Sequence, residues 1–391
     1  MKSDPLPATF AESGDQYRIP ALLIERTRGL QPGDKVSLSD LRDLDPYGAE
    51  AFATLARRYG VSETSPGTWV LERKPRWLPA WIGSEHEAQW FELFEAAYGY
   101  RIDARLWRWK YRGAVRPGMG AWRDGRLVAF YGAMPRATLF LGKPVSTVQI
   151  GDVMVRPEER GVMTRSGPFQ IAASTFIDRS VGYGRPHLFG FGFPTDKALQ
   201  VAQKLGLYER VDQMTELAWP AADSWGARLL RSEQLMPQHR PVIESLWQAM
   251  AQDFRGSVIG VRDADYIEQR YQMHPTVHYE CLLVRKLLTG AAQGLVVLRS
   301  IDQDQVELMD LIGPRSNFAA LVEVARRWAW RNGARRVRAW VTASHVELLA
   351  GTAPAATPMD LMVPANVWSP GPSADELRGR WWLMAGDTDF R

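Results

Sequence analysis

Residues 148–169 read VQIGDVMVRPEERGVMTRSGPF, and the fold expected for this chain is built outward from that stretch. Its first part is an apolar strand that ends at Arg156-Pro157, and its last part is a turn that opens a helix near Pro168. The start of a helix carries unpaired backbone N–H groups and the positive end of the helix dipole, so it favours an anion. The order of strand, turn and helix therefore predicts a site for a pyrophosphate group.

The neighbouring segments predict the sheet to which this strand belongs. Upstream, Asp124-Gly125 lies between two apolar runs, which is typical of a β-hairpin. Downstream, the sequence predicts a helix over 168–181, a strand over 187–193 and a helix over 196–205. Paired strands followed by strand, helix, strand and helix indicate an α/β fold of the α+β kind, with a mixed sheet and helices on its faces.

The second half of the chain resembles the first. The hexapeptide YIEQRY at 266–271 is similar to LWRWKY at 106–111. The strand VELMDLI at 306–312 is similar to VQIGDVMV, with Asp310 in the place of Asp152. An offset of roughly 160 residues is a whole domain and not a solenoid repeat, so it predicts a duplication.

Length and charge limit the class of protein. With 391 residues, of which 46% are hydrophobic, the chain is long enough for several cores. We expect an N-terminal module of unknown role at 1–82, a first unit at 83–222 and a second unit at 223–391. The 48 Lys and Arg residues exceed the 44 Asp and Glu residues only slightly and are spread along the chain. Without a zinc pattern or a dense basic block, this balance disfavours a nucleic-acid-binding protein.

The location of the protein is predicted from what the sequence lacks. The single cysteine, Cys281, excludes an internal disulfide and fits a reducing compartment, and its apolar neighbours predict a small buried side chain. No apolar run reaches the ~20 residues of a membrane span, and the first residues do not resemble a signal peptide. We therefore expect a cytoplasmic protein without a membrane span; no oligomeric state is predicted.

The segment V-x-P-x-x-R-G, which runs from Val155 to Gly161, resembles the acyl-CoA-binding segment of the GCN5-related N-acetyltransferase (GNAT) superfamily. The resemblance implies two GNAT-like domains in tandem after a small N-terminal module. It also implies transfer of an acyl group from acetyl-CoA, or another acyl-CoA, to an amine on a small molecule or peptide. The second unit lacks this segment, so we expect it to be degenerate and to wall the acceptor pocket of the first.

The resemblance also implies which residues hold the cofactor. In this family, backbone N–H groups of the corresponding strand polarise the thioester, and the turn after it binds the pyrophosphate. The residues assigned in this way are Val153, Met154, Val155, Arg160, Gly161, Val162, Thr164, Arg165, Ser166 and Gly167. No metal site is predicted.

Three residues are candidates for the proton transfers. Asp152 interrupts an apolar strand, where burial would raise the pKa of a carboxylate and suit a general base. The alternative is a structural acid, because Asp310 occupies the matching place in the second unit; His187 is another candidate base. Tyr208 is the candidate acid for the departing thiolate, although the family's usual tyrosine position is Ala202 here, and a core tyrosine is the alternative.

Other functions stay open at this stage. The family's turn usually has glycine or another small residue where this sequence has Met163 and Arg165. This departure favours, as the main alternative, a catalytically inactive GNAT-fold protein that binds acyl-CoA or a protein partner. A third possibility is the transfer of aminoacyl groups from tRNA to peptides, which some tandem members of the family perform.

Overall fold

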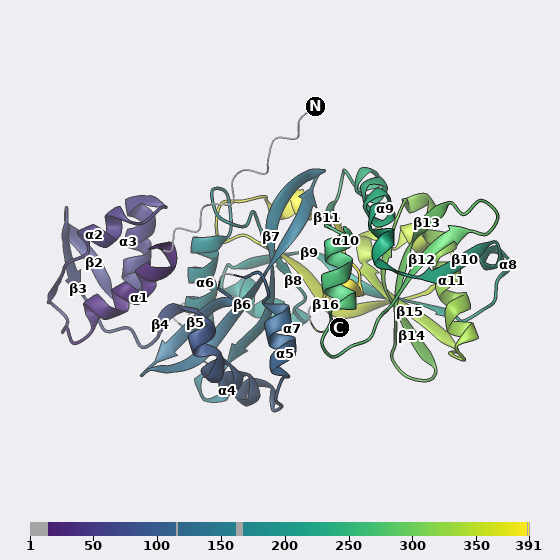
Figure 1. The fold of residues 1–391 in the computed structure, drawn as a ribbon. Coiled ribbons are helices and arrows are strands. Elements are labelled where there is room, and N and C mark those ends of the chain that lie inside the picture. Colours follow the sequence, from purple (N-terminus) through teal and green to yellow (C-terminus); the bar gives the residue numbers. More distant parts are fainter. Residues whose placement is uncertain (1–14, 115, 162–166, 389, 391) are drawn as a thin grey trace.

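The computed structural model describes residues 15–114, 116–161, 167–388 and 390, which form three parts in a row (Figure 1). A small module lies at one end, and two larger units follow it. Each unit has a mixed sheet covered by helices, so the α/β fold with two similar units after a small module is confirmed.

The N-terminal module is a three-stranded sheet with the order β1-β3-β2, packed against three helices. Its own core contains Phe52, Leu55 and Trp69, which are almost completely buried. The elements are α1 (Asp15–Thr27), β1 (Lys35–Val36), α2 (Ser39–Asp43), α3 (Gly48–Arg58), β2 (Val61–Ser65) and β3 (Thr68–Leu71).

The first unit contains an antiparallel run of four strands, then a helix, then a parallel strand. Neighbours from β4 to β7 are antiparallel, and β8 pairs in parallel with β7 after the crossover helix α6. Asp124 and Gly125, with φ of +51° and +76°, form the turn from β5 to β6, which confirms the predicted hairpin. The elements are β4 (Leu78–Ile82), α4 (Glu87–Tyr98), α5 (Ala104–Lys110), β5 (Gly118–Arg123), β6 (Arg126–Phe140), β7 (Lys143–Val155), α6 (Pro168–Ser180), β8 (Gly190–Gly192) and α7 (Asp196–Lys204).

The second unit repeats this order. Its strands β10, β12, β13 and β14 are antiparallel neighbours, and β15 pairs in parallel with β14 after the helix α11. The elements are α8 (Trp225–Arg228), β10 (Leu230–Gln234), α9 (Arg240–Asp253), β11 (Val258–Gly260), α10 (Ala264–Ile267), a π-helical turn (Glu268–Gln272), β12 (Glu280–Lys286), β13 (Ala292–Ser300), β14 (Gln305–Ile312), α11 (Phe318–Arg331), β15 (Arg336–Thr342) and α12 (Glu347–Ala350).

Several strands cross from one unit to the other. The strand β9 (Tyr208–Pro220) lies between β15 and β16 (Ala355–Asn366) in the second sheet. Conversely, β11 pairs with β6 and with β17 (Trp381–Trp382), which follows the short helix α13 (Ala374–Leu377), so both extend the first sheet. Sheet membership therefore does not follow the division predicted at residue 222, and the domain boundaries stay a prediction.

Within the described ranges, no helix combines the length and the apolar character needed to traverse a lipid bilayer.

Candidate active site

The strands β7 and β8 separate after a short stretch of pairing. Their ladder runs only from Val148 opposite Gly190 to Ile150 opposite Gly192. There β8 ends, while β7 continues to Val155. A first side-chain carbon on Gly192 would lie 2.8 Å from the Ile150 carbonyl oxygen, so glycine permits this close approach. The edge of β7 beyond Ile150 is consequently open.

A cavity of about 520 Å³ lies at this opening. The ends of β7 and β8 form its floor, the first turn of α6 and the helix α7 flank it, and Tyr208 lies at the start of β9. Two segments from far along the chain complete the wall, namely Pro364 of β16 and Phe390. Nine of its twenty lining residues are aromatic: Phe94, Tyr98, Tyr100, Tyr131, Phe169, Phe191, Phe193, Tyr208 and Phe390.

The backbone of β7 presents N–H groups to this opening. The Val153 carbonyl accepts a hydrogen bond from the Tyr98 hydroxyl (3.3 Å), on the edge away from β6. The Arg156 N–H donates to the Val128 carbonyl (2.8 Å), on the edge toward β6. Because successive residues of a strand alternate between its edges, the N–H groups of Val153 and Val155 face the opening. Met154 faces β6, where it pairs with Phe130.

The turn after β7 uses the arginine that the sequence singled out. Arg160 donates from Nε to the Val155 carbonyl (3.0 Å) and from Nη2 to the Ala97 carbonyl (3.0 Å), which ties the end of α4 to β7. Gly161 has φ of +88°, a conformation that favours glycine, and Gly167 precedes the first turn of α6. The remaining turn residues predicted to bind the cofactor lie outside the described residues: Val162, Thr164, Arg165 and Ser166.

Asp152 lies at a bulge between β6 and β7, with φ of +48°. Lys110 Nζ lies 2.7 Å from both carboxylate oxygens of Asp152, and the Tyr111 hydroxyl donates to Oδ2 (2.9 Å). The side chains of Lys110 and Asp152 are only 4% and 10% exposed. Asp152 is among the residues that line the cavity, but its carboxylate is already paired with Lys110. Sequence reasoning missed Lys110 and Tyr111 as its partners, although both belong to the LWRWKY segment that pointed to the duplication.

Tyr208 lies in the cavity wall with its ring buried. Burial raises the pKa of its phenol well above the usual value, so the hydroxyl stays protonated. The hydroxyl of Tyr131 is also buried in this wall and has no hydrogen-bond partner among the described residues. His187, the other candidate base, does not line the cavity; its Nδ1 lies 2.8 Å from Ser146 Oγ, and burial lowers its pKa to about 4.

The second unit has the same separation of strands, but its own chain fills the gap. The ladder between β14 and β15 ends at Leu308 opposite Ala339, while the strands continue to Ile312 and Thr342. The segment 381–388 enters between them. The Thr342 N–H donates to the Leu383 carbonyl (3.2 Å). A first side-chain carbon on Gly386 would collide with the Tyr271 hydroxyl and lie 3.0 Å from the Met309 carbonyl oxygen, so glycine permits this close packing.

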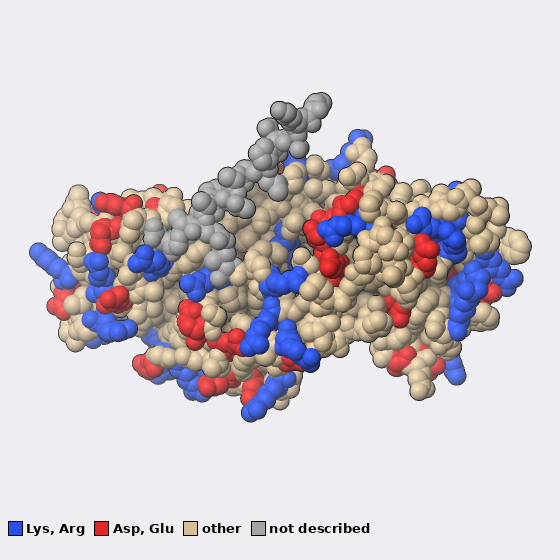
Figure 2. Space-filling model, viewed as in Figure 1, with Lys and Arg blue, Asp and Glu red and all other residues tan. Residues whose placement is uncertain are grey.

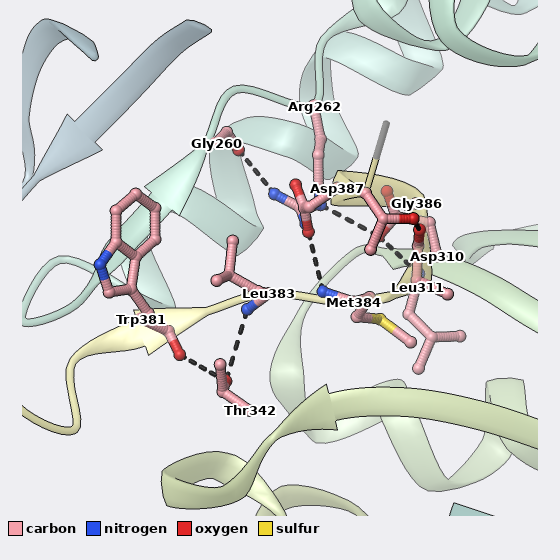
Figure 3. Close-up of polar contacts among 12 residues, drawn as sticks. Gly260, Arg262, Asp310, Leu311, Thr342, Trp381, Leu383, Met384, Gly386 and Asp387 are labelled. Atoms are coloured by element: carbon pink, nitrogen blue, oxygen red, sulfur yellow. Dashed lines mark hydrogen bonds and ion pairs between the residues drawn. The ribbon is translucent and has the colours of Figure 1, made fainter. Parts of the chain in front are cut away.

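A buried ion cluster fixes this segment (Figure 3). Arg262 donates from Nε to Asp310 (3.0 Å) and from Nη2 to Asp387 (2.6 Å) of the incoming segment. The Tyr271 hydroxyl donates to Asp310 (2.9 Å), in the same way that Tyr111 donates to Asp152. The carboxylate and tyrosine thus recur in a unit whose gap is filled, which favours a structural part for both acids.

The comparisons with known proteins agree with this geometry. Residues 82–167 match the family model described as acetyltransferase (GNAT) domain. This segment is therefore similar to a GNAT domain. The match begins at Ile82, the last residue of β4, and ends at Gly167, directly before α6, so it includes the open edge of β7. A comparison with curated protein sequences gives no match.

Three solved structures show how far the GNAT fold extends. A probable N-acyltransferase of unknown function from Enterococcus faecalis V583 has a TM-score of 0.58 and 15% identity, over 78% of this chain and 73% of that one. A GCN5-related N-acetyltransferase from Kribbella flavida has a TM-score of 0.55 and 17% identity, over 73% and 70%. Another from Anabaena variabilis has a TM-score of 0.54 and 14% identity, over 75% and 73%. At such identities the likeness shows the fold alone, and its extent includes both units.

Proposed function

We propose that this protein is an N-acyltransferase that moves an acyl group from acyl-CoA to an amine, with one cofactor site in the first unit. The observation that carries the proposal is the contrast between the two gaps. The gap between β7 and β8 opens on a cavity of about 520 Å³. The equivalent gap between β14 and β15 holds the segment 381–388.

The reaction assigns distinct tasks to the residues around the opening. The amine nitrogen attacks the thioester carbon and the C–S bond breaks. The nitrogen gives its proton to solvent water, and the leaving thiolate takes a proton from an acid of the protein. The N–H groups of Val153 and Val155 would hold the thioester, and the start of α6 with the turn from Arg160 to Gly167 would hold the pyrophosphate. Tyr208, protonated at neutral pH, would give its proton to the thiolate.

Asp152 is proposed to order the bulge of β7 rather than to accept the proton. A base must be free to bind a proton, but both oxygens of Asp152 are held by Lys110. The competing proposal keeps Asp152 as the general base and requires that its carboxylate be released from Lys110. In either case the bulge turns the following N–H groups of β7 toward the opening.

The cavity walls favour an acyl group larger than acetyl. Rings such as Phe191, Phe193 and Tyr208 give the cavity an apolar lining. Each methylene of an acyl chain that is buried against such a lining makes the free energy of binding more favourable. A small-molecule or peptide amine would approach from the side of the cavity that is bordered by Phe390, which comes from the end of the second unit.

Thermal-shift measurements with acetyl-CoA and with longer acyl-CoAs test the site. A ligand at 100 times its Kd should stabilise the protein by about 2.7 kcal/mol. Ala198→Trp places an indole in the cavity mouth from an exposed position of α7 and should abolish the shift. Ala49→Trp, at an exposed position of α3, is the matched control and should leave it unchanged.

Turnover is then measured as release of free CoA thiol with a panel of amines. Amine-dependent thiol release supports the transferase. Binding without release for every amine and acyl-CoA would support the alternative, a GNAT-fold protein that only binds acyl-CoA. No shift with any acyl-CoA would contradict the cofactor site itself and leave a protein partner as the remaining function.

A further inference from the structure

The end of the second unit that lies farthest from the N-terminal module exposes an unusual group of large apolar side chains. Trp225 is 74% exposed and Leu288 is 93% exposed, and Leu229 and Leu287 are each more than half exposed. We call these four residues the apolar tip. They belong to α8, to the residue before β10 and to the turn between β12 and β13. Single exposed apolar residues are common, but four in one place mark an interaction surface.

Hydrogen bonds show that the two segments of the apolar tip adjoin. The Leu287 N–H donates to the Leu229 carbonyl (2.9 Å), and β10 pairs with β12 from Leu230 opposite Lys286 onward. Trp225 and Leu229 are one helical turn apart, so they lie on the same side of α8. Leu288 follows Leu287 in the turn between β12 and β13, and its side chain is almost fully exposed. The apolar tip is therefore one surface, formed by α8 with the residue after it and by the turn between β12 and β13.

Positive charges surround the apolar tip. The helix α11 packs beside α8, where Arg327 Nη1 donates to the Ala227 carbonyl (2.7 Å). Asp223 is paired with Arg228 and Arg327, so the nearest acid is already neutralised. Arg231 and Lys286 lie in β10 and β12 directly beside the tip, and Arg331 is the last residue of α11, one turn after Arg327; none of the three forms an ion pair with any described residue. Figure 2 shows Lys and Arg gathered at this end of the molecule, where Figure 1 places α8.

We propose that the apolar tip docks on an anionic lipid surface. Exposed Trp and Leu side chains enter the boundary between headgroups and acyl chains, and Lys or Arg beside them contact the acidic headgroups. The surplus of unpaired cations selects this partner over a second copy of the same chain, since two such tips facing each other would repel. The active-site cavity lies in the other unit, so docking would leave it uncovered.

Vesicle flotation of the full chain tests the proposal. Phosphatidylcholine vesicles containing roughly a quarter phosphatidylglycerol should bind the protein, and pure phosphatidylcholine should bind it far less. Leu288→Asp should lower the partition coefficient about tenfold or more, because it removes an inserted side chain. Arg231→Gln should lower it about fivefold on anionic vesicles. Leu44→Asp, at another exposed leucine in the N-terminal module, is the control and should change nothing.

Three results would overturn the proposal. The first is no binding to either vesicle, and the second is equal loss of binding for Leu288→Asp and Leu44→Asp. The third is a dimer in light scattering that Leu288→Asp converts to monomer, which would assign the tip to self-association. The far-UV circular dichroism of each variant shows that its fold is kept. The assay does not depend on acyl transfer, so its outcome is independent of the proposed function.

Discussion

The ion pair between Lys110 and Asp152 gives the sharpest prediction for stability. Both side chains are almost completely buried, and two hydrogen bonds of 2.7 Å join them. Removing one partner of a buried pair leaves the other charge without compensation and typically costs about 3–5 kcal/mol. We expect Asp152→Asn to lower the free energy of unfolding by about this amount, since Asn still accepts the Tyr111 hydrogen bond but cannot balance Lys110.

A double-mutant cycle separates the pair from its surroundings. Lys110→Met alone should also destabilise, but Asp152→Asn together with Lys110→Met should cost at least about 2 kcal/mol less than the sum of the single changes. The assay is urea unfolding followed by tryptophan fluorescence. Glu209→Gln, which breaks the half-exposed pair with Arg378, is the control and should cost less than about 1 kcal/mol. Additive effects of the two buried substitutions would refute the reasoning.

Three further predictions follow from buried groups. Trp382→Ala should lower stability by about 3–5 kcal/mol, measured by urea unfolding, because its fully buried ring packs against Phe254 and Phe318 in the filled gap; a loss below about 1 kcal/mol would contradict that packing. His187 has a pKa lowered from 6.5 to about 4, so its contribution to stability is complete above pH 6.5 and is lost as the pH falls toward 4. In urea titrations across that range, His187→Asn should flatten the decline by at most about 3 kcal/mol, and an unchanged pH profile would count against the buried neutral imidazole. Tyr208→Phe should lower kcat for thiol release by about 10²-fold or more with little change in the KM for acyl-CoA, and a changed KM with unchanged kcat would leave Tyr208 as a wall residue.

Much of the fold follows from local pattern. The helices predicted over 168–181 and 196–205 each differ by one residue from α6 and α7. These segments combine an apolar face with clear start and stop residues, and both signals are local in sequence. The Asp124-Gly125 hairpin was predictable for the same reason, because a turn signal between two apolar runs is also local in sequence. The repeated Tyr and Asp of the two units were also visible, because duplication leaves related segments at a fixed offset.

The filled gap of the second unit could not be read from the sequence. The entry of residues 381–388 between β14 and β15 depends on contacts such as Arg262 with Asp387, which are 125 residues apart. No local pattern encodes a contact of that range. The exchange of β9 and β11 between the sheets was missed for the same reason.

The assignment of the cofactor-binding residues stays a prediction. The V-x-P-x-x-R-G segment marks the end of β7, and Val153 of this strand lines the cavity. Tyr208 lies in the cavity wall, where only the fold of the chain could bring it. The partner of Asp152 was not found, since Lys110 lies on a helix that precedes the strand by 42 residues. The catalytic roles of Asp152 and Tyr208 stay predictions.

The first unit is proposed to have an open cofactor site, while the segment 381–388 fills the equivalent gap in the second unit. The most direct test is the number of acyl-CoA molecules that bind to each chain. Isothermal titration of the full chain with a non-reactive thioether analogue of a long acyl-CoA measures the number of sites. We predict one molecule bound per chain, and none for Ala198→Trp. Two molecules per chain, or undiminished binding to Ala198→Trp, would contradict the account.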